Sequence, residues 1–179
     1  MRIREITLKP FRNFEHRCVT LDADRVLISG ANGLGKSNIL EAISYLSIGK
    51  SVRGCRDQMA IPHGGEHFDV EGRCNDGENE HKLRIYCAKD SGKKCFCDDA
   101  PLSRVSELLG VLKTVHFAPE DVALVLRFPA ERRRALDILI SQASSSYLHD
   151  LQQYNRVLTQ RNRALRVGSH GVFDADAVR

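Results

Sequence analysis

The sequence contains no long hydrophobic stretch. Although 42% of its 179 residues are hydrophobic, no apolar run approaches the roughly 20 residues that a membrane-spanning helix needs. Residues 1–5 carry charges where a secretory signal peptide would place its apolar segment. We therefore expect a cytoplasmic protein that does not associate with membranes.

The cysteines lack the C-x-x-C spacing that is typical of zinc ribbons and redox sites. Their scatter along the chain predicts reduced thiols in a reducing compartment, and a metal site remains the alternative. On a strand, Cys95 and Cys97 would share one face because they are two residues apart. No Ser–His–Asp or H-E-x-x-H constellation is recognisable. The six cysteines are Cys18, Cys55, Cys74, Cys87, Cys95 and Cys97.

Tryptophan is absent and the charge is only mildly unbalanced, with a net charge of +4 and a sequence pI near 8.8. A basic balance is compatible with phosphate or nucleic-acid partners. Many unrelated cytosolic proteins are as basic, so the charge does not select a function.

One glycine-rich segment carries specific chemistry. Residues 30–37 match the P-loop pattern G-x-x-x-x-G-K-[ST] at every fixed position. The glycines let the backbone wrap around phosphate, and the N-terminus of the following helix favours the negative charge. Lys36 would neutralise β- and γ-phosphate oxygens, while the Ser37 hydroxyl would ligate Mg²⁺. The predicted ATP-binding loop comprises Gly30, Ala31, Asn32, Gly33, Leu34, Gly35, Lys36 and Ser37.

The hydrophobic pattern predicts the elements around this loop. An alternating meander is expected over residues 68–97, with turns at Asn75-Asp76-Gly77 and Asp90-Ser91-Gly92. Continuous apolar runs favour buried strands at 25–29 and 111–117. Further strands are predicted at 2–8 and 16–21, and helices at 36–47, from Pro129 onward and from about Tyr147 to Arg166. The second of the C-terminal helices has coiled-coil spacing at Leu151, Tyr154, Leu158 and Leu165.

Several collinear segments resemble the RecF family, whose members are recombination-repair ATPases related to SMC and ABC proteins. They cover residues 1 to about 166. The matching segments are F-R-N-F at 11–14, N-I-L-E-A-I at 38–43, G-K-S-V-R at 49–53, H-F-A-P-E-D at 116–121, P-A-E-R-R-R with L-D at 129–137, and the Y-L to Q-R-N segment at 147–162.

This resemblance implies an α/β P-loop lobe of ABC/SMC type, with an antiparallel meander and a helical extension. Residues 1–127 would form the ATPase lobe and residues 128–179 the start of a helical lobe. Arg12 and Asn13 would approach the phosphates or the ribose of ATP. The family binds single-stranded and gapped duplex DNA in an ATP-dependent way, dimerises on ATP, and acts with RecO and RecR in recombinational gap repair.

The sequence departs from the ABC pattern in two motifs. It contains neither an S-x-G-Q signature nor a Walker B strand ending in Asp-Glu, because Asp98 and Asp99 fall at an expected hairpin turn. In the family these motifs lie beyond this length, so we expect the chain to be the N-terminal half of a longer protein. We also expect it to bind nucleotide weakly and not to hydrolyse it at a useful rate.

Arginines on the two C-terminal helices are candidate DNA contacts. Three adjacent arginines at a helix start spread over most of a turn, so internal pairing or a solvated face remain alternatives. The candidates are Arg132, Arg133, Arg134, Arg156 and Arg161. Three other functions stay open: a small P-loop kinase, a transporter ATPase subunit, and a non-hydrolysing nucleotide-binding interaction module.

Overall fold

The computed structural model describes residues 2–75, 77–119, 121 and 129–168. The chain divides into two compact units, Met1–Leu126 and Arg127–Arg179. The first unit carries the sheet and the P-loop, and the second carries two helices. In the described part of the chain, no helix combines the length and the apolar character needed to cross a membrane.

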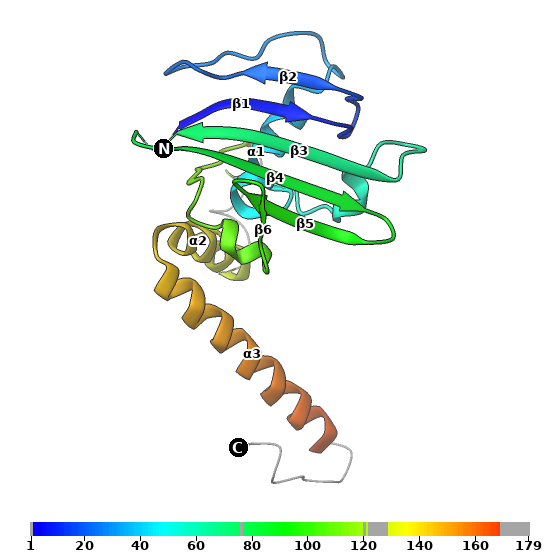
Figure 1. Ribbon diagram of the computed structural model, residues 1–179. Coiled ribbons are helices and arrows are strands. Elements are labelled where there is room, and N and C mark those ends of the chain that lie inside the picture. Colours follow the sequence, from blue (N-terminus) through cyan, green and yellow to red (C-terminus); the bar gives the residue numbers. More distant parts are fainter. Residues whose placement is uncertain (1, 76, 120, 122–128, 169–179) are drawn as a thin grey trace. The chain divides into compact units, whose positions relative to one another are not determined.

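A six-stranded antiparallel sheet forms the framework of the first unit (Figure 1). Its spatial order is β2-β1-β3-β4-β5-β6, so the strands from β3 to β6 form a meander beside the N-terminal pair. The predicted meander and both N-terminal strands are confirmed. The strands are β1 (Arg2–Leu8), β2 (Arg17–Thr20), β3 (His67–Asn75), β4 (Glu80–Ala88), β5 (Gly92–Cys97) and β6 (Ala100–Pro101).

Alternation along β3 and β4 explains why these segments form a sheet with one buried face. Phe68 lies opposite Cys87 and Val70 lies opposite Ile85, and all four side chains are buried. Gly92 is the first residue of β5 after the tight turn from β4, and its φ of 72° suits glycine. The register therefore gathers the apolar side chains on one face, where a helix can cover them.

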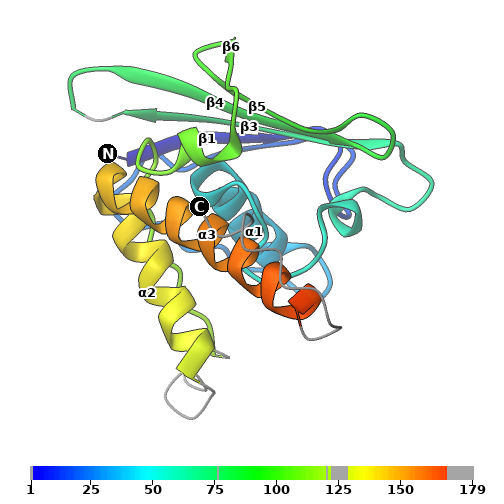
Figure 2. The same cartoon turned by 90° about the horizontal axis from the view of Figure 1, so that it is seen from below.

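Helix α1 (Lys36–Ile48) covers that buried face of the sheet (Figure 2). Phe11, Tyr45 and Phe68 meet edge to face, with ring centroids 5.1–5.8 Å apart. A Cβ atom at Gly72 of β3 would overlap the side chain of Leu46, so glycine is needed where the helix approaches the sheet. The core thus fixes α1 and, through it, the P-loop that precedes it. The described part of this unit also contains two short 3₁₀ helices, η1 (Asp57–Ala60) and η2 (Val105–Leu108).

Two predicted strands are wrong. Residues 26–30 and 113–118 have no regular secondary structure, and neither predicted segment belongs to the described sheet. Leu27 is 91% exposed, and Val115 and Phe117 are 84% and 79% exposed. A strand buried on both faces needs neighbouring strands and covering layers. Among the described residues, no strand pairs with either segment, so Leu27, Val115 and Phe117 stay in solvent. Leu112 is buried, and Ile28 and Val111 pack against the core without forming a strand.

Two helices joined by a tight turn form the second unit: α2 (Pro129–Ala143) and α3 (Ser145–Gly168). Pro129 stands at the first helical position, where its fixed φ and missing N–H are tolerated. The break between the two helices consists of Ser144 alone. The Ser144 hydroxyl accepts a hydrogen bond from the Tyr147 N–H at 3.2 Å. The Tyr147 hydroxyl donates to Asp137 at 2.6 Å and ties the two helices together. Both predicted helices are confirmed.

Candidate nucleotide-binding site

The P-loop lies at the N-terminus of α1, as the sequence predicts. Gly35 has a φ of 93° and immediately precedes the helix, while Gly33 has a φ of 85°. Side chains with a Cβ atom rarely adopt these values. The first turn of α1 contains no acidic residue. The helix therefore presents the positive end of its dipole without a competing carboxylate in its first turn, which favours an anion.

Lys36 bends back over the loop. Its Nζ donates to the carbonyl oxygens of Gly30 and Ala31, both at 2.8 Å. The loop encloses a small hollow of ≈ 270 Å³ whose wall includes Gly33, Lys36, Ser37 and Arg53. The described lining contains two cations and no carboxylate. Its size and charge suit a group of phosphates.

The turn that contains Asn13 and Phe14 packs directly on the P-loop. A Cβ atom at Gly35 would lie 2.6 Å from both the Asn13 Oδ1 and the Phe14 Cζ. The Asn38 side chain of α1 donates to the Asn13 Oδ1 at 2.8 Å. The F-R-N-F segment and the P-loop, which are 16 or more residues apart in sequence, are therefore one structural unit.

A buried carboxylate holds two arginines beside the loop. The Glu41 side chain is fully buried, and Arg12 donates to it through Nε at 3.1 Å and Nη2 at 2.5 Å. Arg53 Nη1 lies 3.3 Å from Glu41 Oε2, and the Ser51 hydroxyl donates to Oε1 at 2.5 Å. Burial alone would lower the pKa of Arg12, but its hydrogen bond with Glu41 and the nearby negative charge raise it. Arg12 is thus held permanently charged.

A second, larger hollow of ≈ 930 Å³ adjoins the P-loop hollow. Asn38 and Arg53 line both, so the two hollows are neighbours. Its wall combines the polar groups of Arg12 and Asn13 with the apolar side chain of Met59. A mixed wall of this size is typical of a small-molecule site.

The structure places the sequence-predicted residues in two groups. Five P-loop residues line the smaller hollow, and Arg12 and Asn13 line the larger one. Gly30 and Ala31 accept the hydrogen bonds of Lys36, whereas Leu34 lines neither hollow. The five are Asn32, Gly33, Gly35, Lys36 and Ser37. Arg12 differs from a freely projecting ligand because its guanidinium also donates to the Met59 carbonyl at 2.6 Å and its side chain is 15% exposed.

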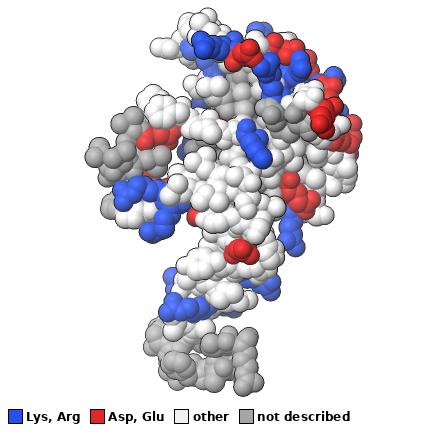
Figure 3. Space-filling model, turned by 90° about the vertical axis from the view of Figure 1, so that its left-hand side faces the viewer, with Lys and Arg blue, Asp and Glu red and all other residues white. Residues whose placement is uncertain are grey.

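The five candidate DNA arginines lie on the second unit and are exposed. Arg132, Arg133 and Arg134 succeed one another at about 100° around the start of α2, so they do not share a face. Arg156 and Arg161 of α3 are about 140° apart, whereas Arg163 lies within about 20° of Arg156. The single acidic residue of α3 is Asp150. Figure 3 shows basic groups and little acidic surface along the long helix.

Glu41 and Arg53 are site residues that sequence reasoning did not single out as such. Glu41 falls beside Ala42 on the buried side of α1, where an unpartnered charge would be costly. That placement is the signal that could have predicted cationic partners. Arg53 ends the G-K-S-V-R segment, and only the folded chain shows that it reaches the P-loop hollow.

The Asp98–Asp99 pair is confirmed as a turn and not as the end of a Walker B strand. Both residues have positive φ values, 51° and 63°, and connect β5 with the two-residue strand β6. Neither residue lines the P-loop hollow. The carboxylates that an ABC-type ATPase uses for hydrolysis are therefore not supplied by this pair.

These features define an α/β P-loop ATPase lobe of the RecF and SMC-head type, the expected fold class. A family described as an AAA domain matches residues 5–162. A solved structure of the recombination mediator protein RecF with ATP superposes with a TM-score of 0.92 at 33% identity, over 98% of this chain and 48% of that one. A solved SMC ATPase chain shares the fold at 22% identity and a TM-score of 0.62, over 78% of this chain and 99% of that one.

Among curated proteins, the DNA replication and repair protein RecF of Lachnoclostridium phytofermentans is 36% identical over 166 residues, which are 93% of this chain and 46% of the relative. The chain therefore belongs to the AAA domain family as a RecF-type member. It spans about half the length of the curated relatives that it matches.

Proposed function

We propose that this chain binds ATP with Mg²⁺ through residues 30–37 and contributes to an ATP-dependent DNA-binding activity in recombinational gap repair. The observation that carries the proposal is the cationic hollow at the start of α1, where the P-loop, Lys36 and Arg53 surround a space without carboxylates. Such a site attracts a polyphosphate and repels no part of it.

The two neighbouring hollows suggest how the ligand lies. The phosphates would occupy the smaller hollow under the backbone N–H groups, and Lys36 would exchange its two carbonyl partners for phosphate oxygens. The Ser37 hydroxyl would ligate Mg²⁺, which would neutralise part of the phosphate charge. The ribose and base would extend into the larger hollow past Asn13, with Arg12 at its border.

The DNA-binding part of the proposal rests on family membership. A similar solved protein is described as a recombination mediator in the RecFOR pathway, which supports RecO and RecR as partners and single-stranded or gapped duplex DNA as the substrate. We assign nucleotide binding to residues 1–127 and the start of a helical lobe to 128–179. An ATP-dependent homodimer would require the full length of the relatives, and the work would take place in the cytoplasm, where bacterial DNA lies.

A second candidate is a nucleotide-binding interaction module that does not hydrolyse ATP. It is favoured by the described lining of the P-loop hollow, which offers no acidic group to orient or deprotonate a water. This candidate would be contradicted if the chain alone hydrolysed ATP and the Lys36→Ala substitution abolished that hydrolysis.

Equilibrium binding of a fluorescent ATP analogue in the presence of Mg²⁺ tests the main proposal. Lys36→Ala should weaken binding by about 10- to 100-fold, because it removes charge-assisted hydrogen bonds to phosphate worth about 1.5–3 kcal/mol. Lys94→Ala, an exposed lysine of β5 away from both hollows, is the matched control and should bind as the wild type does. Equal affinities for all three proteins would refute the P-loop site.

The same titration with gapped duplex DNA tests the coupling to DNA. If the helices carry DNA contacts, DNA should tighten nucleotide binding, and the double substitution Arg156→Glu with Arg163→Glu should remove the effect. Substitution of Arg161, which faces elsewhere on α3, would have a smaller influence. Nucleotide binding that is indifferent to DNA would leave the P-loop assignment intact and exclude DNA coupling within this chain.

A further inference from the structure

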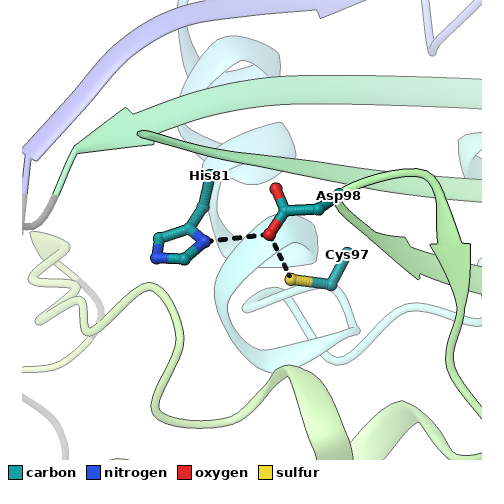
Figure 4. A group of neighbouring side chains, drawn as sticks. All are labelled: His81, Cys97 and Asp98. Carbon is teal, nitrogen blue, oxygen red and sulfur yellow. Dashed lines mark hydrogen bonds and ion pairs between the residues drawn. The ribbon is translucent and has the colours of Figure 1, made fainter. Parts of the chain in front are cut away.

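Three potential metal ligands meet at one corner of the sheet, away from both nucleotide hollows. They are His81 near the start of β4, Cys97 at the end of β5 and Asp98 in the turn that follows (Figure 4). One donor atom from each residue lies within 4.8 Å of the other two. The chain thus brings a nitrogen, a sulfur and an oxygen ligand together at one point.

The strand register explains this convergence. Cys97 lies opposite Leu83, and His81 precedes Leu83 by two residues. His81 and Cys97 therefore project from the same face of the sheet as diagonal neighbours. The chain then turns with a φ of 51° at Asp98, and the Asp98 carboxylate returns toward the His81 ring. Strand register and turn geometry thus bring the three residues to one corner of the sheet.

The distances between these groups are already close to those of a metal site. The His81 Nδ1 is 3.0 Å from the Asp98 Oδ2, and the Cys97 Sγ is 3.8 Å from the same oxygen. Tetrahedral zinc with ordinary bond lengths separates nitrogen from oxygen by about 3.3 Å and sulfur from oxygen by about 3.5 Å. Shifts of about 0.3 Å would bring these two pairs to that geometry. The His81 and Cys97 donor atoms lie within 4.8 Å of each other, and rotation of the two side chains would have to bring them to the roughly 3.6 Å that zinc requires.

The site is also supported and accessible. The Asp98 Oδ1 accepts a hydrogen bond from the Lys82 N–H at 2.8 Å, which leaves Oδ2 directed at His81 and Cys97. Lys82 Nζ pairs with Asp99 at 2.8 Å and not with Asp98. Side-chain exposures of 27% for His81 and 52% for Asp98 leave room for a metal to enter and for a water as the fourth ligand.

We propose that His81, Cys97 and Asp98 form a zinc site that fastens the start of β4 to the β5–β6 turn. The ligand types select this metal, since imidazole, thiolate and carboxylate together suit Zn²⁺, whereas Mg²⁺ and Ca²⁺ require several oxygen ligands. Zinc would displace the proton of the Cys97 thiol and bind its thiolate. The site is independent of the nucleotide site and of the function proposed above.

Cobalt substitution of the nucleotide-free, full 179-residue chain provides the first test. Co²⁺ should give a thiolate-to-cobalt charge-transfer band in the near ultraviolet, saturating at one ion per chain, and Zn²⁺ should displace it. Cys97→Ser should abolish the band. His81→Asn and Asp98→Asn keep the approximate shape of each side chain and should weaken Co²⁺ binding by about 100-fold or more. Loss of a residue that only supports a metal ligand typically lowers metal affinity about 10- to 100-fold, and loss of a ligand itself should lower it at least as much.

Two matched controls separate this site from adventitious binding. Cys55→Ser removes a thiol elsewhere, and Asp99→Asn removes the neighbouring carboxylate of the same turn, which pairs with Lys82 instead. Both should leave the spectrum unchanged. A band that survives Cys97→Ser, or one that Cys55→Ser removes, would overturn the proposal, as would the absence of any thiolate band in the wild type.

A thermal melt gives a readout that does not depend on spectroscopy. Zinc at about 100 times its Kd should raise the Tm of the wild type by about 5 °C or more. The metal-free Tm of each variant shows whether it is folded, so a folded Cys97→Ser protein whose Tm does not respond to zinc supports the site. A folded Cys97→Ser protein with the full zinc-induced shift would refute it.

Discussion

Arg12 and Glu41 form a two-pronged ion pair, with contacts of 3.1 Å and 2.5 Å, that joins the F-R-N-F turn to the helix leaving the P-loop. Glu41 is the fully buried member of the pair. It also accepts a hydrogen bond from the Ser51 hydroxyl and forms an ion pair with Arg53. One carboxylate therefore fixes the position of two cations that border the candidate nucleotide site. The arrangement makes the stability of the lobe and the shape of the site depend on the same residue.

Replacing Glu41 should destabilise the lobe strongly. Glu41→Gln leaves the Arg12 guanidinium in a buried environment without its counter-ion, a change that typically costs about 3–5 kcal/mol. Urea denaturation followed by circular dichroism measures the loss. Glu5→Gln, whose carboxylate is partly exposed and 4.0 Å from its nearest cation, is the matched control and should stay within about 0.5 kcal/mol of the wild type. Similar midpoints for the two variants would contradict the role given to Glu41.

Gly33 and Gly35, the two P-loop glycines just before α1, should differ in their tolerance of alanine. Both have positive φ values, so each substitution costs about 1 kcal/mol of backbone strain. At Gly35 the added Cβ would also collide with Asn13 and Phe14, while at Gly33 it meets nothing within 4 Å. Gly35→Ala should therefore lose more stability and more nucleotide affinity than Gly33→Ala. Equal effects in thermal melts and in ATP-analogue titrations would show that the F-R-N-F turn does not buttress the loop.

Alanine substitutions at Leu46 and Leu27 test whether the segment 25–29 is exposed rather than a buried strand. Leu46→Ala removes a fully buried side chain and should cost about 2–5 kcal/mol of unfolding free energy. Leu27→Ala removes a side chain that is 91% exposed and should cost less than about 0.5 kcal/mol. Denaturant midpoints distinguish the two cases. A large cost at Leu27 would mean that this segment is buried in solution.

Alkaline pH should destabilise the lobe through Cys95. Burial raises the pKa of this thiol from 9.0 to about 11. Between these values the unfolded chain releases the proton while the folded chain keeps it, so the unfolding free energy falls as pH rises from about 9 to about 11, by at most about 3 kcal/mol. The slope of stability against pH should be shallower in Cys95→Ala. Cys18→Ala, at an exposed thiol, should retain the wild-type slope, and identical slopes for all three proteins would refute the buried-thiol account.

Much of the lobe could be predicted because its signals are local. The alternating apolar residues of β3 to β5 and the glycines of their turns specify hairpins between neighbouring segments. The P-loop pattern likewise requires only a contiguous stretch of chain followed by a helix. The predictions of strands at 25–29 and 111–117 are wrong because a continuous apolar run indicates burial but does not identify the neighbouring elements that would bury it. Leu27 and Phe117 show that an apolar segment stays exposed where the described chain offers no neighbouring strand.

The sequence by itself determined the place of the P-loop before a helix, the meander and the two C-terminal helices, since each depends on side-chain periodicity or on contacts within a few residues. Only the tertiary structure decided that Glu41 would hold Arg12 and Arg53 beside that loop, and that His81 would meet Cys97 and Asp98 at a corner of the sheet. Those partners are 12 to 29 residues apart along the chain. Their meeting depends on strand register and helix packing, which no local pattern encodes.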